Sequence, residues 1–173
     1  MSKPYVVGID IGGTNTVFGI VDARGVVLAS SSIKTRKNPT IEGYLDELHT
    51  ELTKLLEAND AVGKIHGIGI GAPNANYYTG TIESGVNLPW PTPIPLAKLV
   101  SDKFGIPVSI TNDANAAAIG EMTYGAARGL KDFIMITLGT GVGSGIVING
   151  QLVYGHDGFA GELGHIIVKR NNG

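Results

Sequence analysis

The segment from Asp10 to Asn15, Asp-Ile-Gly-Gly-Thr-Asn, constrains this chain more than any other. Apolar runs precede it (residues 5–9) and follow it (residues 17–21), which predicts a turn between two strands. Glycine permits unusual backbone angles and leaves no Cβ to block a ligand, and successive N–H groups in such a turn can form a concave anion site. A phosphate-binding turn is therefore one interpretation. Taken alone, an ordinary hairpin turn with Asp10 facing water is the simpler one.

Asp10 adds a condition to the phosphate-binding interpretation. A carboxylate would repel phosphate oxygens unless a cation lay between them, and Mg²⁺ prefers oxygen ligands and commonly bridges carboxylates, water and phosphates. We therefore expect Asp10 to face a bridging Mg²⁺ through one of the ion's water molecules.

Hydrophobic periodicity predicts a mixed α/β chain. Three runs joined by short glycine-bearing turns predict an antiparallel meander, and apolar residues at 3–4 spacing predict a long amphipathic helix capped by Asn38. The predicted order is strands at 5–10, 16–22 and 26–33, a helix from 39 to 56, a strand at 65–71, an irregular segment to 95, a helix at 96–104, a strand at 108–111, a helix at 114–124, and strands at 133–138, 144–148 and 151–154. We expect residues 1–120 to form one domain and residues 121–173 to begin a second.

Polar or glycine positions stand at three predicted strand ends: Asp10, Gly71 and the pair Asn112-Asp113. Ligands of open α/β sheets collect beyond the carboxyl ends of strands, so these positions should converge. Asp113 could simply cap the helix that follows it. Alternatively it could act as a general base that takes a proton from a substrate hydroxyl attacking a γ-phosphate, with Asn112 gripping neighbouring hydroxyls.

Two later segments carry further candidates. Residues 139–145, Gly-Thr-Gly-Val-Gly-Ser-Gly, form a second glycine-rich turn that could face a nucleotide's phosphates, although a glycine-rich hairpin explains it almost as well. It matches neither the dinucleotide pattern nor a Walker loop, because Ser144 replaces the third glycine and no Gly-Lys-Ser/Thr follows. Glu162 and His165 are three residues apart, so on a helical turn they share a face and could hold the hydroxyls of a polyol.

Charge and composition argue against some classes of binding partner. The net charge is −2 with no basic stripe, which argues against nucleic acid. The chain has no cysteine, which excludes disulfides and thiolate metal sites and is compatible with a reducing compartment. The uncharged stretch at 133–155 contains six glycines and reads as paired strands, not as a membrane span. No signal peptide is evident at the start. We expect a cytoplasmic protein without a membrane partner.

Taken together, these residues resemble the ROK family (repressors, open reading frames and sugar kinases) of the actin-like ATPase superfamily. The matching pieces occur in family order along nearly the whole chain: residues 8–15 (GIDIGGTN), 69–74 (GIGAPN), 87–90 (NLPW), 112–118 (NDANAAA), 138–145 (LGTGVGSG) and 158–165 (GFAGELGH). The resemblance implies an actin-like, ribonuclease H-like α/β domain with a mixed sheet, followed by the first strands of a second, similar lobe.

The resemblance also implies an ATP-dependent hexose kinase, with glucose the commonest substrate and fructose, mannose or N-acetylated hexosamines as alternatives. ATP and Mg²⁺ would be held by the two glycine-rich turns, and Asp113 would be the base. The phosphate-binding residues would be Asp10, Gly12, Gly13, Thr14, Gly139, Thr140 and Gly141. The sugar-binding residues would be Gly71, Asn87, Asn112, Glu162 and His165. A homo-oligomer is compatible with the family.

The sequence also departs from the family. Family members continue into a cysteine cluster that joins the histidine on zinc, and then into the adenosine site. Here no cysteine occurs, so no zinc site is expected in this chain. We also expect it to carry only the phosphate-binding part of the nucleotide site. The isolated chain is therefore expected to be a poor catalyst or an inactive one. Two alternatives stay open: a sugar-responsive repressor, for which the nine residues before Asp10 leave no room for a helix-turn-helix, and a non-catalytic sugar- or nucleotide-binding module.

Overall fold

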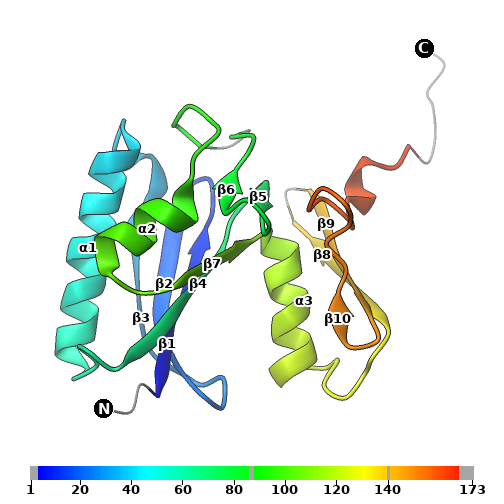
Figure 1. Ribbon diagram of the computed structural model, residues 1–173, viewed down its shortest axis with the longest axis horizontal. Coiled ribbons are helices and arrows are strands. Elements are labelled where there is room, and N and C mark those ends of the chain that lie inside the picture. The colour runs from blue at the N-terminus through cyan, green and yellow to red at the C-terminus, as the bar shows by residue number, and fades with distance from the viewer. Residues whose placement is uncertain (1–3, 86–87, 140, 168–173) are drawn as a thin grey trace. The chain divides into compact units, whose positions relative to one another are not determined.

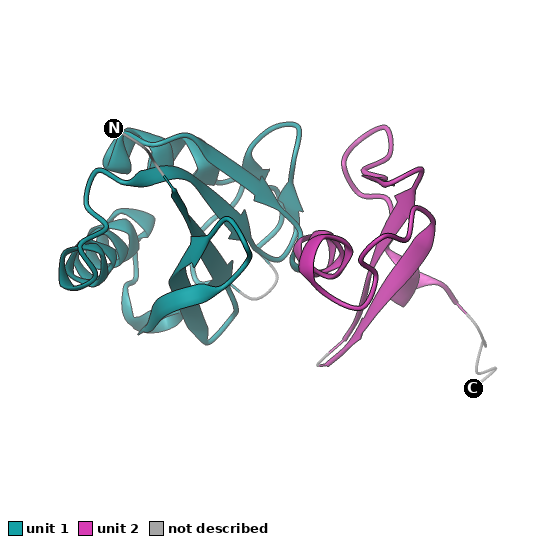
Figure 2. Ribbon diagram, turned by 90° about the horizontal axis from the view of Figure 1, so that it is seen from below, with its two compact units in different colours: residues 1–113 teal, residues 114–173 magenta. Residues whose placement is uncertain are grey.

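The computed structural model describes residues 4–85, 88–139 and 141–167, which divide into two compact units, residues 1–113 and 114–173 (Figure 2). The division at residues 113 and 114 lies close to the sequence-based boundary at 120 and 121, and the assignment of residues 1–120 and 121–173 to two lobes stays a prediction.

The first unit is built on a five-stranded mixed sheet in the order β3-β2-β1-β4-β7 (Figure 1). Its strands are β1 (Tyr5–Ile11), β2 (Asn15–Asp22), β3 (Val27–Lys34), β4 (Ile65–Gly71) and β7 (Val108–Thr111). The first three strands pair antiparallel, which confirms the predicted meander, whereas β1, β4 and β7 run parallel. The carboxyl ends of β1, β4 and β7 therefore meet at one edge of the sheet.

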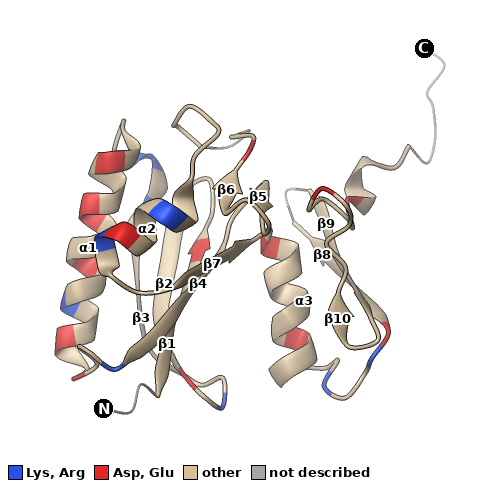
Figure 3. Ribbon diagram, viewed as in Figure 1, with Lys and Arg blue, Asp and Glu red and all other residues tan. Residues whose placement is uncertain are grey.

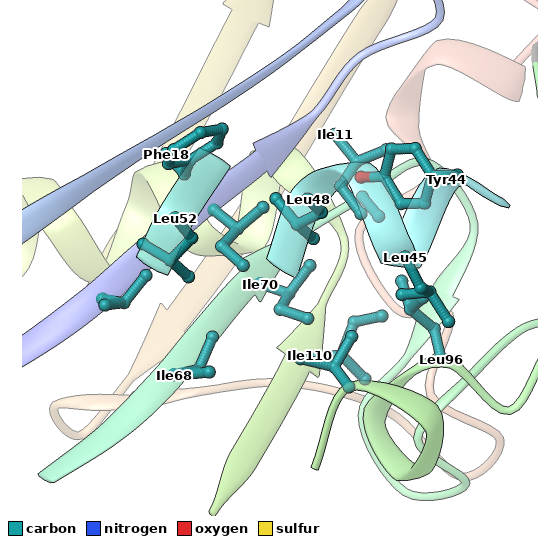
Figure 4. Close-up of a cluster of buried hydrophobic side chains, with 14 of the residues drawn as sticks. Ile11, Phe18, Tyr44, Leu45, Leu48, Leu52, Ile68, Ile70, Leu96 and Ile110 are labelled. Atoms are coloured by element: carbon teal, nitrogen blue, oxygen red, sulfur yellow. The ribbon is translucent and has the colours of Figure 1, made fainter. Parts of the chain in front are cut away.

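Helices α1 (Ile41–Ala58) and α2 (Leu96–Phe104) cover one face of this sheet. The core forms between them and alternate strand positions, because successive side chains of a strand point to opposite faces. Figure 4 shows this cluster, with leucines of α1 packed over sheet residues such as Ile70 and Ile110, and with Tyr44 beside Ile11. On β1, the inward positions Ile9 and Ile11 leave Asp10 on the other face.

The start of α1 corrects one prediction. Thr40, not Asn38, caps the helix: its backbone is extended and its hydroxyl accepts a hydrogen bond from Gly43 N at 3.2 Å. Asn38 makes other hydrogen bonds. Its side-chain amide donates to Glu47 Oε2 at 2.5 Å, and its backbone carbonyl accepts from Trp90 Nε1 at 3.1 Å.

The segment expected to be irregular, residues 72–95, contains two short paired strands, β5 (Ala75–Asn76) and β6 (Thr81–Ile82). Ile82 also bridges to Ile94, which brings the chain back to α2. Trp90 is only 4% exposed and joins the core. A further short 3₁₀ helix, η1 (Thr35–Lys37), follows β3.

The second unit contains α3 (Asp113–Tyr124), which starts at the last residue of the first unit, and a three-stranded antiparallel sheet. The strands are β8 (Phe133–Leu138), β9 (Val142–Ile148) and β10 (Gln151–Leu152), followed by the 3₁₀ helix η2 (Leu163–His165). Asn149 and Gly150 have φ values of 54° and 73°, as a tight hairpin turn between β9 and β10 requires. Every second residue of β8 (Ile134, Ile136 and Leu138) is exposed. None of the helices in the described ranges has the length and apolar character of a membrane span.

Candidate active site

The predicted strand-end positions lie side by side on neighbouring strands of the first unit's sheet. Asp10 pairs with Gly71, and Gly71 pairs with Thr111, so these three residues form one row across β1, β4 and β7. The neighbouring positions Ile9, Ile70 and Ile110 are buried in the core, so the row lies on the face opposite α1 and α2. Gly71 adds no side chain between the two polar residues beside it. The chain continues from Thr111 directly into Asn112 and Asp113.

The carboxylates of Asp10 and Asp113 are close enough to influence each other. Partial burial of the Asp10 carboxyl raises its pKa above the usual value, and the negative charge of Asp113 raises that pKa further. Asp113 is exposed and lies in the first turn of α3, where the helix dipole favours a carboxylate. Two like charges held at one sheet edge create a site that a bound cation would stabilise. This donor set fits the Mg²⁺ expected at Asp10.

The raised pKa of Asp10 gives a testable pH dependence. The folded state holds this proton more tightly than the unfolded state, so Asp10 makes stability fall as pH rises from the ordinary aspartate range through the raised pKa. Replacing Asp113 with asparagine should lower the pKa of Asp10, because one of its two causes disappears. A ¹³C-carboxyl NMR titration measures this, with Asp102→Asn on α2 as the matched control. An Asp10 pKa that is the same in Asp113→Asn and in the parent would contradict the proximity.

The glycine-rich turn between β1 and β2 is closed by its own backbone. Gly12 N donates to Asn15 O at 3.0 Å, and Lys34 Nζ donates to Asn15 Oδ1 at 2.8 Å, which places an ammonium group beside the turn. Thr35 contacts the turn twice, since its hydroxyl donates to Gly12 O at 2.7 Å and its amide to Thr14 O at 3.0 Å. Sequence reasoning missed Lys34 and Thr35. The signal was only the strand register, which pairs Asn15 with Lys34.

Thr111 also belongs to this edge of the sheet. Its hydroxyl is buried and has no hydrogen-bond partner among the residues that the structure describes. A buried hydroxyl without a partner costs free energy, and here it stands in the same row as Asp10. The edge therefore holds two carboxylates, an amide and a hydroxyl. These groups can form hydrogen bonds with the hydroxyls of a substrate and with the water molecules of a hydrated cation.

The remaining predicted residues lie in the second unit. Gly139, which follows β8, donates its N–H to Gly141 O at 3.0 Å. Glu162 and His165 share one side of a 3₁₀ turn, with Oε2 and Nε2 3.6 Å apart and the imidazole exposed. The joining of these residues with Asp10 and Asp113 around one substrate stays a prediction.

Two predicted site residues, Asn87 and Thr140, lie outside the described residues. Within the ranges that are described, no cluster of three or more His, Cys, Asp or Glu side chains is arranged to hold a metal ion. A Mg²⁺ ion at Asp10 would thus depend on water and phosphate oxygens for most of its ligands.

Comparison with known proteins decides the family. The ROK family model matches residues 6–173. The chain belongs to the ROK family. It is 39% identical over 170 residues to a glucokinase of Halalkalibacterium halodurans, covering 97% of this chain and 51% of that protein. It is also 32% identical over 169 residues to a putative xylose repressor of a Caldicellulosiruptor species, covering 96% of this chain and 42% of the repressor.

Solved structures agree with this ROK assignment. A ROK family glucokinase from Streptomyces griseus, solved with glucose and AMPPNP, superposes with a TM-score of 0.82 at 39% identity, covering 95% of this chain and 51% of that one. The predicted actin-like ATPase fold with a mixed sheet is confirmed. This ROK chain spans about half the length of the curated glucokinases it matches.

Proposed function

We propose that this ROK chain is the amino-terminal part of an ATP-dependent hexose kinase that phosphorylates glucose at its 6-hydroxyl. One observation carries the proposal: Asp10 lies in one row with Gly71 and Thr111, and two residues after Thr111 stands Asp113, whose negative charge adds to burial in raising the pKa of Asp10. One carboxylate can then serve the nucleotide while the other serves the alcohol. The likeness to glucokinases supports glucose as the first hexose to test.

Asp113 is the general base in this proposal. Its carboxylate accepts the proton of the sugar hydroxyl as that oxygen forms a bond to the γ-phosphorus, while the bond from phosphorus to the bridging oxygen of ADP breaks. Its exposure at the first turn of α3 leaves the carboxylate accessible to a hydroxyl. Asn112 precedes it and can contact an adjacent sugar hydroxyl.

The turn that contains Gly12, Gly13 and Thr14 would offer phosphate oxygens the N–H groups that do not close it, since Gly12 N donates to Asn15 O, and Lys34 adds a positive charge nearby. Asp10 would hold Mg²⁺ through water, and that ion neutralises charge on the phosphates when bound. Gly139, Thr140 and Gly141 would face the same phosphates. On the sugar side, Glu162 and His165 would hold hydroxyls together with Gly71 and Asn87.

The proposed partners are a hexose and ATP, in the cytoplasm, with no nucleic acid and no membrane. Figure 3 marks several positions of charged residues along α1 and α2. On α1, five acidic residues accompany a single lysine, which is unlike a phosphate-neutralising surface. A homo-oligomer remains compatible with this arrangement.

Enzyme assays test the proposal. We would measure hexose-dependent ADP formation with this chain and with an extended chain, in which the remaining part of the Halalkalibacterium halodurans glucokinase follows residue 173. We expect turnover in the extended chain, with glucose preferred over fructose, mannose and N-acetylglucosamine, and little or none in the 173-residue chain. An extended chain that folds, binds ATP-Mg and glucose, and turns over none of these sugars would overturn the proposal.

The similarity to a xylose repressor favours a second candidate, a sugar-responsive regulator. Calorimetry and gel-shift assays distinguish the candidates. Sugar binding with DNA retention at physiological salt would indicate the regulator, whereas binding of sugar or ATP-Mg without turnover or DNA retention would indicate a non-catalytic binding module.

A further inference from the structure

We propose that Thr35 is a positioning residue for the phosphate-binding turn, supported through a buried chain of hydroxyls that begins at Tyr44. This inference rests on the proposed function, because it concerns the turn that would bind the phosphates of ATP. The hydroxyl chain consists of the side chains of Tyr44, Thr16 and Thr35, each of them 0% exposed.

The direction of the hydroxyl chain is fixed at one end. Thr35 Oγ1 donates its proton to Gly12 O at 2.7 Å, since a carbonyl can only accept. Thr35 Oγ1 must then accept from Thr16 Oγ1 at 3.0 Å, and Thr16 Oγ1 in turn accepts from Tyr44 Oη at 3.0 Å. All three protons therefore point toward the turn. Hydrogen bonds aligned in this way polarise and strengthen one another.

Thr35 fixes the direction in which the turn's amides point. Its hydroxyl and its amide hold the carbonyls of Gly12 and Thr14. Because a trans peptide is planar, with its C=O and N–H on opposite sides, the N–H groups of Gly13 and Asn15 point away from Thr35. An anion-binding turn needs that orientation fixed before the ligand arrives, because the free energy of ordering is then not taken from binding.

The other end of the hydroxyl chain is anchored in the core. Burial raises the pKa of Tyr44, so its hydroxyl stays protonated and remains a donor at neutral pH. Its ring contacts Trp90, with centroids 4.5 Å apart, and Trp90 Nε1 donates to Asn38 O at the approach to α1. The turn is thereby tied to α1 and to the segment that precedes α2.

Three substitutions test this role. Thr35→Val keeps the shape and removes the hydroxyl, Thr35→Ser keeps the hydroxyl, and Ile68→Val is a control that weakens the buried core away from the turn. We expect Thr35→Val to weaken ATP-Mg binding about tenfold in calorimetry, because a turn amide that is no longer held in place would lose its hydrogen bond to a charged phosphate oxygen. Thr35→Ser and Ile68→Val should stay within about twofold of the parent. Tyr44→Phe, at the far end of the hydroxyl chain, should have an intermediate effect.

Hydrogen exchange gives a readout that does not depend on the ligand. The amide of Gly12, which closes the turn on Asn15 O, should exchange faster in Thr35→Val and return to the parent rate in Thr35→Ser. Unchanged exchange at Gly12 in Thr35→Val, or ATP-Mg affinity lost equally in Ile68→Val, would overturn this inference. Failure of the parent and of the extended chain to bind ATP-Mg would instead overturn the proposed function, while exchange at Gly12 would still decide whether Thr35 holds the turn.

Discussion

Replacing Asp113 with asparagine is expected to lower hexose phosphorylation by the extended chain about 10²- to 10⁴-fold, the usual contribution of a general base. The amide keeps the size and one acceptor oxygen of the carboxylate but cannot take the hydroxyl proton. The exposed position of Asp113 makes a folding defect from this change small. The loss should appear in kcat, with KM for the hexose changing less, because the proton is transferred only in the transition state.

Asp102→Asn provides the matched control for this loss. Asp102 is also an exposed helical aspartate of the first unit, but it pairs with Lys98 on α2 at 2.5 Å, away from the strand ends. It should retain parental turnover. Phosphorylation that survives in Asp113→Asn would remove Asp113 from the role of base and would overturn the proposed mechanism.

Much of this architecture could be predicted because its signals are local. Alternating apolar residues and short glycine-bearing turns specify the meander, and the 3–4 spacing of leucines specifies α1. The row of Asp10, Gly71 and Thr111 follows from parallel strands that end at one edge. Asp10 and the Asn112-Asp113 pair could therefore be expected at one edge of the sheet from the sequence alone, while their roles stay predictions.

The misses come from contacts between distant segments. Asn38 looked like a helix cap because nothing nearby shows that Glu47 and Trp90 occupy it. Thr35 follows a predicted strand and carried no sequence signal of its own, yet the pairing of β2 with β3 places it against Gly12 and Thr14. Such roles depend on register and on three-dimensional packing, which local propensity does not contain.

The other large effect is expected on the stability of the second unit, where α3 packs closely against β9. A Cβ added at Gly145 would lie 2.6 Å from Ala118 Cβ and 3.1 Å from the carbonyl oxygen of Ala114. Those neighbours are backbone and a short side chain, so neither can rotate away. Gly145→Ala is therefore expected to push the helix off the strand and to lower the free energy of unfolding by about 2 kcal/mol, within the usual cost of overpacking.

Gly120→Ala separates this steric effect from a general response to alanine. Gly120 lies on α3 itself, and a Cβ there meets nothing within 4 Å, so the change should stabilise the helix by about 0.5–1 kcal/mol. Hydrogen exchange at the amides of α3 and β9 measures the stability change in each variant at the site of the substitution. Fluorescence of Trp90, the single tryptophan of the chain, shows whether the first unit stays folded. Equal protection of β9 in Gly145→Ala and in the parent would mean that the helix and strand are not held at this distance. The small residues at 114, 118 and 145 would then have no packing reason to be small.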